Sequence, residues 1–147
     1  MTERLNVAEV APDGYKAMLG LERYVRQNVD STVLELVKLR ASIINGCSFC
    51  VDMHSRDALA AGESSRRLFA VGAWREAPFF DERERAALAL TDEATRLGPD
   101  GVSDETWALV TKSWSEKEAA DLILAIVTIN AWNRIAIPSR QSPPVDV

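Results

Sequence analysis

Apolar residues recur at intervals of three or four positions through nearly the whole chain. This spacing places apolar side chains on one face of an α-helix, whereas a half-buried strand requires strict alternation of apolar and polar residues. The β-branched run at residues 126–129 favours a strand locally, but it lies inside a longer stretch with helical spacing. The pattern therefore predicts an all-α fold, a bundle of about seven helices.

Capping residues and turn signals set the expected limits of these helices. Ser, Thr, Asp or Asn before an apolar period indicates a helix start, and Gly or Pro after it indicates a stop. On this basis the last helix ends near residue 135, ahead of Pro138, and residues 139–147 form a loose tail around a single-domain core of about residues 12–136. The seven helices are expected at residues 12–27, about 30–45, 47–61, 64–71, 81–97, from Ser103 to beyond Val110, and 115–135.

Composition and charge narrow the class of protein. Hydrophobic residues make up 47% of the 147 residues, enough for the core of one domain. The net charge is −5 and no block rich in Lys and Arg offsets it, which argues against a nucleic-acid partner. We find no apolar stretch of roughly 18 residues, and the N-terminus lacks the features of a secretory signal. We therefore expect a cytoplasmic protein with no membrane partner.

The candidate chemistry is concentrated in one segment. Both cysteines and the only histidine lie within residues 47–54, as Cys47, Cys50 and His54. Cys and His are the side chains best suited to redox, nucleophilic and metal chemistry near neutral pH. On a helix, positions i, i+3 and i+7 project from one face, so we expect the three side chains to share a surface.

A helix N-terminus alone does not activate a thiol sufficiently. A thiol of pKa about 8.5 is only a few per cent ionised at pH 7, and lowering that pKa by two units takes roughly 2.7 kcal/mol. A helix terminus contributes about 0.3–1 kcal/mol, and about 2 kcal/mol in the best partly buried geometry. A second group must therefore accept the proton. His54, one turn after Cys50, and Glu35, on the preceding helix, are the candidates.

Other interpretations of these residues remain open at this point. The two cysteines could be small buried hydrophobic residues, and Thr32-x-x-Glu35 could be a capping box. Cys47, Cys50 and His54 could bind a metal with Glu35 or Asp52 as fourth ligand, although structural zinc sites usually draw ligand pairs from separate segments. A redox-sensing or assembly protein without its own substrate is a further alternative.

Glu35, Cys47, Cys50 and His54 also carry a family resemblance. Their spacing resembles the signature of the AhpD-like alkylhydroperoxidases, within the carboxymuconolactone decarboxylase superfamily. Eleven residues separate Glu35 from the Cys47-x-x-Cys50 pair, and three residues separate Cys50 from His54. Residues 39–54 are similar to the family core, and residues 84–90 and 129–134 match more loosely. One departure is Phe49, because some members carry a histidine just before the second cysteine, so one relay group is absent here.

The resemblance implies an all-α homo-oligomer, often a trimer or hexamer, with thiol peroxidase activity and no bound cofactor or metal. It implies that Cys50 meets the hydroperoxide and becomes a sulfenic acid, that Cys47 resolves it to a disulfide, and that Glu35 and His54 relay protons. An external dithiol, such as a lipoylated protein, would then reduce the disulfide. Helix-dipole reasoning alone favours Cys47 as the attacking thiol. The γ-carboxymuconolactone decarboxylases lack the cysteine pair, so decarboxylation is not expected.

Overall fold

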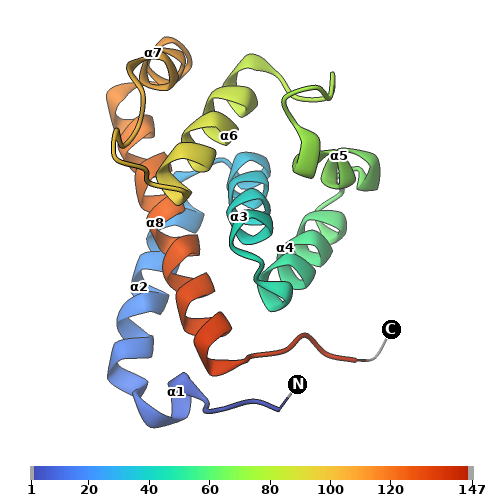
Figure 1. Ribbon diagram of the computed structural model, residues 1–147, viewed down its shortest axis with the longest axis vertical. Coiled ribbons are helices and arrows are strands. Elements are labelled where there is room, and N and C mark those ends of the chain that lie inside the picture. Colours follow the sequence, from blue (N-terminus) through green and yellow to red (C-terminus); the bar gives the residue numbers. More distant parts are fainter. Residues whose placement is uncertain (1, 146–147) are drawn as a thin grey trace.

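The computed structural model describes residues 2–145, and every regular element in that range is helical (Figure 1). The prediction of an all-α fold is confirmed. Eight α-helices and one 3-10 segment are present, one α-helix more than expected. They are α1 (Val7–Val10), α2 (Pro12–Asn28), α3 (Ser31–Asn45), α4 (Ser48–Ala60), α5 (Ser65–Ala70), η1 (Val71–Ala73), α6 (Glu82–Thr95), α7 (Asp104–Ser113) and α8 (Glu116–Ser139).

Helix α3 lies at the centre of the bundle and packs against α4, α6 and α8 (Figure 1). Helix α8 lies along α2 and α3 and also contacts α6. The core between these helices is made of almost fully buried aliphatic side chains, among them Leu36, Val37, Leu88, Leu122 and Ile129. Each such side chain contributes roughly 1.5–3 kcal/mol when it leaves water. The central helix that precedes the cysteines is therefore held firmly on three sides.

The helix starts agree closely with their capping signals, and the last helix end does not. Helix α2 begins at Pro12, and the Ser115–Glu118 capping box opens α8 as expected. Pro138 was expected to lie beyond α8, but the helix runs on to Ser139. The Ser139 hydroxyl donates hydrogen bonds to the carbonyls of Ile135 and Ala136, which helps to satisfy this helix end.

The C-terminal tail begins later than expected. We expected the tail to begin at Ser139, but Ser139 is the last residue of α8. Residues 141–145 have no regular structure. Residues 146 and 147 of the expected tail lie outside the described residues.

Helix α8 contradicts the expectation that the chain has no apolar stretch of roughly 18 residues. Its 24 residues include an 18-residue window of mean hydropathy 1.4, so by length and composition alone it could cross a membrane. Core helices pass the same test, and 44% of that window is buried in the structure, where α8 packs against α2, α3 and α6. The apolar character of α8 is accounted for in large part by its place in the core.

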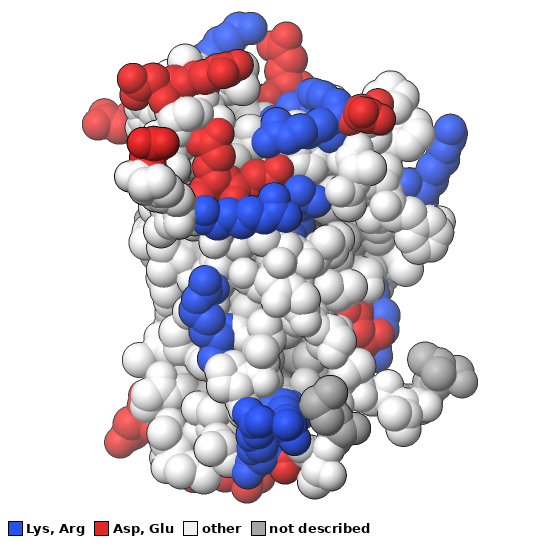
Figure 2. All heavy atoms as spheres, in the orientation of Figure 1, with Lys and Arg blue, Asp and Glu red and all other residues white. Residues whose placement is uncertain are grey.

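Charged side chains gather toward the two ends of the face shown in Figure 2. Acidic and basic residues alternate over the end that carries α6 and α7, and few charged residues cross the middle of this face. The two termini approach each other, since the Arg4 backbone N–H donates to the Ser139 carbonyl at 2.9 Å. The N-terminal segment is thereby tied to the end of α8.

Candidate active site

A tight corner between α3 and α4 positions the cysteines. Helix α3 ends at Asn45, and Gly46 takes a left-handed conformation with φ 70°, which a residue with a side chain rarely adopts. Cys47 follows as the N-cap of α4, and its sulfur accepts a hydrogen bond from the Cys50 backbone N–H at 3.4 Å. Gly46 therefore allows the chain to turn at once from the central helix into the helix that carries Cys50 and His54.

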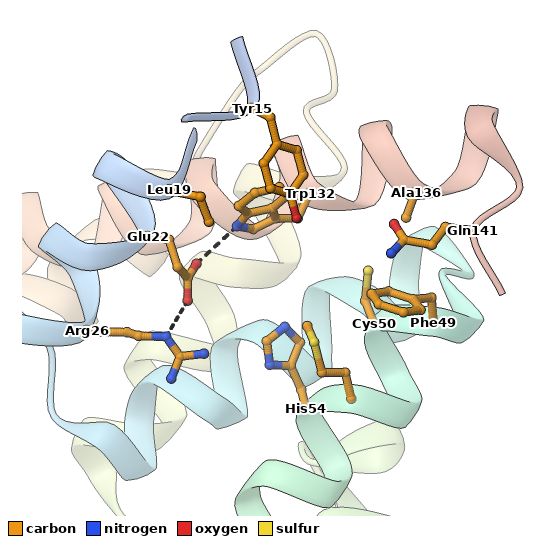
Figure 3. A pocket seen from close by; sticks show the side chains of 11 residues that line it. Tyr15, Leu19, Glu22, Arg26, Phe49, Cys50, His54, Trp132, Ala136 and Gln141 are labelled. Atoms are coloured by element: carbon orange, nitrogen blue, oxygen red, sulfur yellow. Dashed lines mark hydrogen bonds and ion pairs between the residues drawn. The ribbon is translucent and has the colours of Figure 1, made fainter. Parts of the chain in front are cut away.

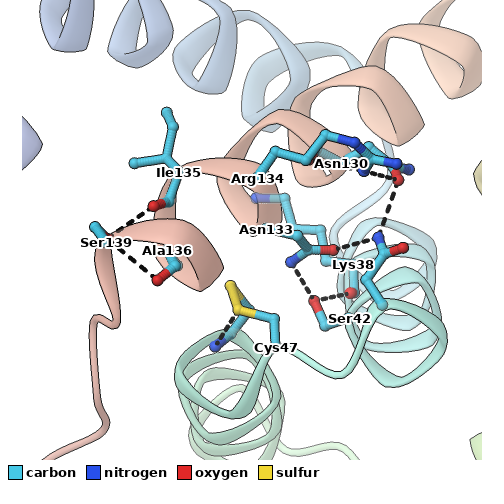
Figure 4. The surroundings of a disulfide bond; sticks show 11 residues. Lys38, Ser42, Cys47, Asn130, Asn133, Arg134, Ile135, Ala136 and Ser139 are labelled. Carbon is cyan, nitrogen blue, oxygen red and sulfur yellow. Dashed lines mark hydrogen bonds between the residues drawn. A yellow bond between two sulfur atoms is a disulfide. The ribbon is translucent and has the colours of Figure 1, made fainter. Parts of the chain in front are cut away.

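A polar network fixes the end of α3 against α8 (Figure 4). The Asn45 side chain donates to Asn130 at 3.0 Å and to Asn133 at 2.9 Å, and Asn133 donates to the Ser42 hydroxyl at 3.1 Å. Asn133 is fully buried within this network. The corner that carries Cys47 is thus anchored to α8.

Cys47 and Cys50 form a disulfide, with 5.4 Å between their Cα atoms. This separation lies in the usual range for bonded cysteines. Both side chains are buried, with 2% of their surface exposed. The two sulfurs can therefore reach each other without a rearrangement of the backbone, which a dithiol–disulfide cycle requires.

His54 and Glu35 are brought together across the α3–α4 contact. The His54 Nδ1 atom lies 2.9 Å from a Glu35 carboxylate oxygen, and the two side chains are 2% and 12% exposed. A carboxylate only accepts hydrogen bonds, so Nδ1 carries the hydrogen, and in the neutral ring Nε2 presents its lone pair. Nε2 is buried and has no hydrogen-bond partner among the described residues. This buried, unpaired acceptor is available to an incoming molecule.

The alternative interpretation of Glu35 as a capping residue is wrong. The N-cap of α3 is Asp30, whose carboxylate accepts hydrogen bonds from the backbone of Thr32 and Val33. Glu35 turns instead toward His54, and its other oxygen lies 4.0 Å from the Arg26 guanidinium. The cap lies two residues earlier than the Thr32-x-x-Glu35 pattern indicates, which leaves Glu35 free for the contact with His54.

A cavity of about 210 Å³ connects Cys50 with His54 (Figure 3). Its walls are largely aromatic and apolar, and Tyr15 packs edge-on against Trp132 with ring centres 5.2 Å apart. The expectation that all three side chains share one surface is only partly right. Cys47 lines a separate cavity of about 280 Å³, because as the N-cap it precedes the helix and the i, i+7 spacing does not apply to it.

A buried charge cluster in the same cavity was missed by the sequence analysis. The Glu22 carboxylate accepts hydrogen bonds from Lys38, from Arg26 at 2.6 Å and from Trp132 at 3.0 Å. Burial raises the pKa of Glu22, but the bonds from Lys38 and Trp132 and the nearby cations outweigh it, so its pKa is lowered overall. Glu22 is thus a fixed anion in the Cys50 cavity, and Lys38, which is fully buried, balances it.

The groups that could bind a metal differ from the expected set. Cys47 and Cys50 are bonded to each other, and Asp52 pairs with Arg56 at 3.4 Å along α4. Ligand atoms of Glu35, His54 and Asp57 lie within 4.8 Å of one another, but Asp57 is exposed and His54 Nδ1 is already bonded to Glu35. This arrangement favours a hydrogen-bonded relay over a metal centre.

Comparison with known proteins identifies similar chains and folds. The sequence model of the carboxymuconolactone decarboxylase family matches residues 11–93. The uncharacterized protein YdfG of Bacillus subtilis is 41% identical over 138 residues, which cover 93% of this chain and 94% of YdfG. A crystal structure of an Agrobacterium tumefaciens protein of unknown function, suggested to be the antioxidant defence protein AhpD, superposes with a TM-score of 0.95. It is 38% identical, and the match covers 99% of this chain and 100% of that one.

A more distant structure shares the fold alone. The debrominase Bmp8, solved with 2,3,4-tribromopyrrole, superposes with a TM-score of 0.83 at 19% identity, over 93% of this chain and 74% of Bmp8. The helical scaffold therefore occurs in proteins of widely different sequence.

Proposed function

The chain belongs to the carboxymuconolactone decarboxylase family, and on this premise we propose that it is a thiol-dependent peroxidase of the AhpD type. It reduces hydroperoxides through a thiol–disulfide cycle of Cys47 and Cys50. The observation that carries the proposal is the unpaired, buried Nε2 of His54, which faces the same cavity as Cys50 while Glu35 holds Nδ1.

The oxidative step begins at the reduced Cys50 thiol. His54 Nε2 takes the thiol proton, and the Glu35 carboxylate stabilises the resulting imidazolium. The thiolate attacks the terminal oxygen of the hydroperoxide, so that an S–O bond forms and the O–O bond breaks. The alcohol leaves with the proton from His54, and Cys50 becomes a sulfenic acid. One hydroperoxide is thereby reduced by two electrons.

The resolving step uses Cys47. Its thiolate is stabilised at the start of α4, where the Cys50 backbone N–H points at the sulfur. It attacks the Cys50 sulfur, the S–S bond forms and the S–O bond breaks, and the hydroxide leaves as water with the proton that the Cys47 thiol released. An external dithiol then returns both cysteines to thiols and becomes a disulfide itself. We propose a lipoylated protein or another dithiol for this role.

Trapping of the sulfenic acid tests the assignment. In Cys47→Ser the resolving thiol is absent, so cumene hydroperoxide and dimedone should give a mass increase of one dimedone adduct on Cys50. Cys50→Ser is the matched control and should give no adduct on Cys47. An adduct on Cys47 in the control, or none in either variant at millimolar peroxide, would contradict the proposal.

We also propose that the chain forms a homo-oligomer of three or six copies. Leu97, Ile123 and Val127 are 70%, 42% and 49% exposed and border an open groove between α6 and α8. Exposed apolar groups gathered in this way are typical of contact surfaces. Sedimentation at micromolar concentration should show a species of several chains, and a 16.2 kDa species alone would contradict it.

A further inference from the structure

The disulfide separates two cavities that differ in their contents. Cys50 faces the cavity that contains His54, whereas Cys47 faces the second cavity, beside the last turn of α8 (Figures 3 and 4). Ala136 and Gln141 border both cavities and form the partition between them. A molecule in one cavity therefore meets one sulfur of the disulfide and not the other.

The two cavities differ in how their charged side chains are paired. The Cys50 cavity contains the anion Glu22, with Arg26 already bonded to it. Among the residues that the structure describes, Arg140 is the only charged one that lines the Cys47 cavity. Within residues 2–145, the hydrogen bonds of Arg140 run through its backbone, and its guanidinium has no carboxylate partner.

The backbone at Arg140 is unusual. Arg140 is the C-cap of α8 with φ 58°, the only non-glycine residue with a positive φ among the described residues. Glycine is the usual residue in this conformation, because a side chain is strained there. The chain thus places a basic residue at the border of the Cys47 cavity, at a position where local stability favours glycine.

The chemistry of disulfide reduction distinguishes the two sulfurs. The attacking thiolate approaches in line with the S–S bond, from the side opposite the leaving sulfur, so attack on Cys47 comes from the Cys47 cavity. A thiolate is anionic, and Arg140 and the N-terminus of α4 both favour an anion there. Attack on Cys50 would instead bring the thiolate into a cavity where, among the described residues, the cation Arg26 is already paired with Glu22. When Cys47 is attacked, Cys50 leaves as a thiolate next to His54, as in the state that precedes attack on the hydroperoxide.

We propose that the Cys47 cavity is the entry site of the reductant, and that Arg140 guides an incoming thiolate to the Cys47 sulfur. This inference rests on the proposed thiol–disulfide cycle. The first thiolate forms a mixed disulfide with Cys47 and releases Cys50 as a thiolate, which takes up a proton from solvent in place of the one that the attacking thiol lost. The second thiol of the reductant then attacks its own sulfur in the mixed disulfide, releasing Cys47 as a thiolate and the reductant as a disulfide. Peroxide and reductant thus use separate cavities.

The site of attack can be determined directly on the oxidised protein. Brief exposure to 2-mercaptoethanol, followed by excess N-ethylmaleimide, fixes the first mixed disulfide before it reacts further. Fragmentation of the peptide that contains both cysteines should place mercaptoethanol on Cys47 and maleimide on Cys50. The reverse placement, or an equal mixture, would overturn the inference.

The role of Arg140 needs variants that share its backbone strain. Arg140→Gln should slow reduction of the disulfide by dithiothreitol about fivefold at low salt, as expected for loss of one nearby charge. Arg140→Lys should retain the rate, and the difference should shrink in 0.5 M salt. Arg96→Gln removes a charge from the exposed end of α6 and is the matched control. An unchanged rate in Arg140→Gln, or no rescue by lysine, would overturn the proposed guidance.

This test is independent of the peroxidase activity. If reduced wild-type protein leaves hydroperoxide untouched, the proposed function fails, while the placement of mercaptoethanol still decides the entry site. If hydroperoxide is reduced but mercaptoethanol is found on Cys50, only the entry site fails.

Discussion

Two of the ionisable side chains of helix α3, Arg40 and Glu35, are paired with different neighbours, and the two pairs differ in one respect. Arg40 binds Asp92 of α6 at 2.5 and 3.2 Å and donates to the carbonyls of Val71 and Gly72. Asp92 also accepts hydrogen bonds from the side chains of Trp74 and Arg75, each at 3.2 Å. In the second pair Glu35 binds His54 of α4, but the far nitrogen of His54 has no hydrogen-bond partner within residues 2–145.

The comparison separates a structural pair from a reactive one. Buried polar groups normally find hydrogen-bond partners, because an unpaired one costs about 1–3 kcal/mol. The Arg40–Asp92 group meets this rule with contacts from α3, α6 and the segment around η1, so it ties those elements together. His54 breaks the rule next to a sulfur and a cavity. An exception of this kind indicates a group that is kept available for a substrate.

The largest expected effect comes from breaking the structural pair. Asp92→Ala leaves the buried Arg40 guanidinium without a carboxylate, and we expect the free energy of unfolding to fall by about 3–5 kcal/mol. Urea titration measures it. Asp52→Ala removes the more exposed pair with Arg56 and should change the value by less than about 1 kcal/mol. Equal losses in the two variants would remove the distinction between a buried and a surface pair.

The next effect comes from the reactive pair. His54→Asn removes the proton acceptor that faces Cys50, and we expect peroxide-driven thiol loss to slow about 100-fold or more. The free energy of unfolding should fall less than in Asp92→Ala, since Nε2 has no contact to lose. Stopped-flow thiol assays and urea titration give the two values. A variant that keeps the wild-type rate would show that His54 is only structural.

Glu35→Gln should have a smaller effect on the same reaction. The glutamine can still bond His54 but no longer stabilises an imidazolium by its charge, so we expect thiol loss to slow about tenfold. Glu63→Gln is a suitable control, because Glu63 pairs with Arg67 away from His54. If the Glu35 and Glu63 variants behave alike, the carboxylate of Glu35 has no part in the relay.

The smallest expected effect concerns Glu22, whose pKa is lowered in the folded protein. A carboxyl group with a lowered folded pKa stabilises the protein above its ordinary pKa of 4.5, and that stabilisation is lost as the pH falls below this value. Urea titrations from pH 6 to pH 3.5 should show this loss in the wild type. Glu22→Gln should be less stable at pH 6 but lose less on acidification, and a loss as steep as in the wild type would contradict the assignment.

The helices could be predicted from the sequence because the signals that define them are local. The caps at Ser115 and Gly46 and the apolar spacing of α3 depend on neighbouring residues, so they are visible in the sequence. The predicted end of α8 was wrong because Pro138 is tolerated in the last turn of the helix, where only Ser139 follows it. The competition between Asp30 and Thr32 for the cap of α3 likewise depends on geometry that spacing does not specify.

The candidate site was predicted from the resemblance, and its surroundings were not. The spacing of Glu35, Cys47, Cys50 and His54 indicated a constellation that the structure brings together within one corner. The Glu22 cluster joins residues up to 110 positions apart, through Trp132, and no local signal connects them. Lys38, between the apolar residues Val37 and Leu39, was a local sign that an acidic partner lay nearby.

A single-turnover measurement tests the central claim most directly. Fully reduced protein, freed of reductant under anaerobic conditions, is mixed with one equivalent of cumene hydroperoxide, and thiols and cumyl alcohol are counted together. The proposed cycle predicts that two thiols disappear per chain as one alcohol forms, with Cys47 and Cys50 joined in a disulfide. Thiols that persist, or that disappear without a matching amount of alcohol, would contradict it.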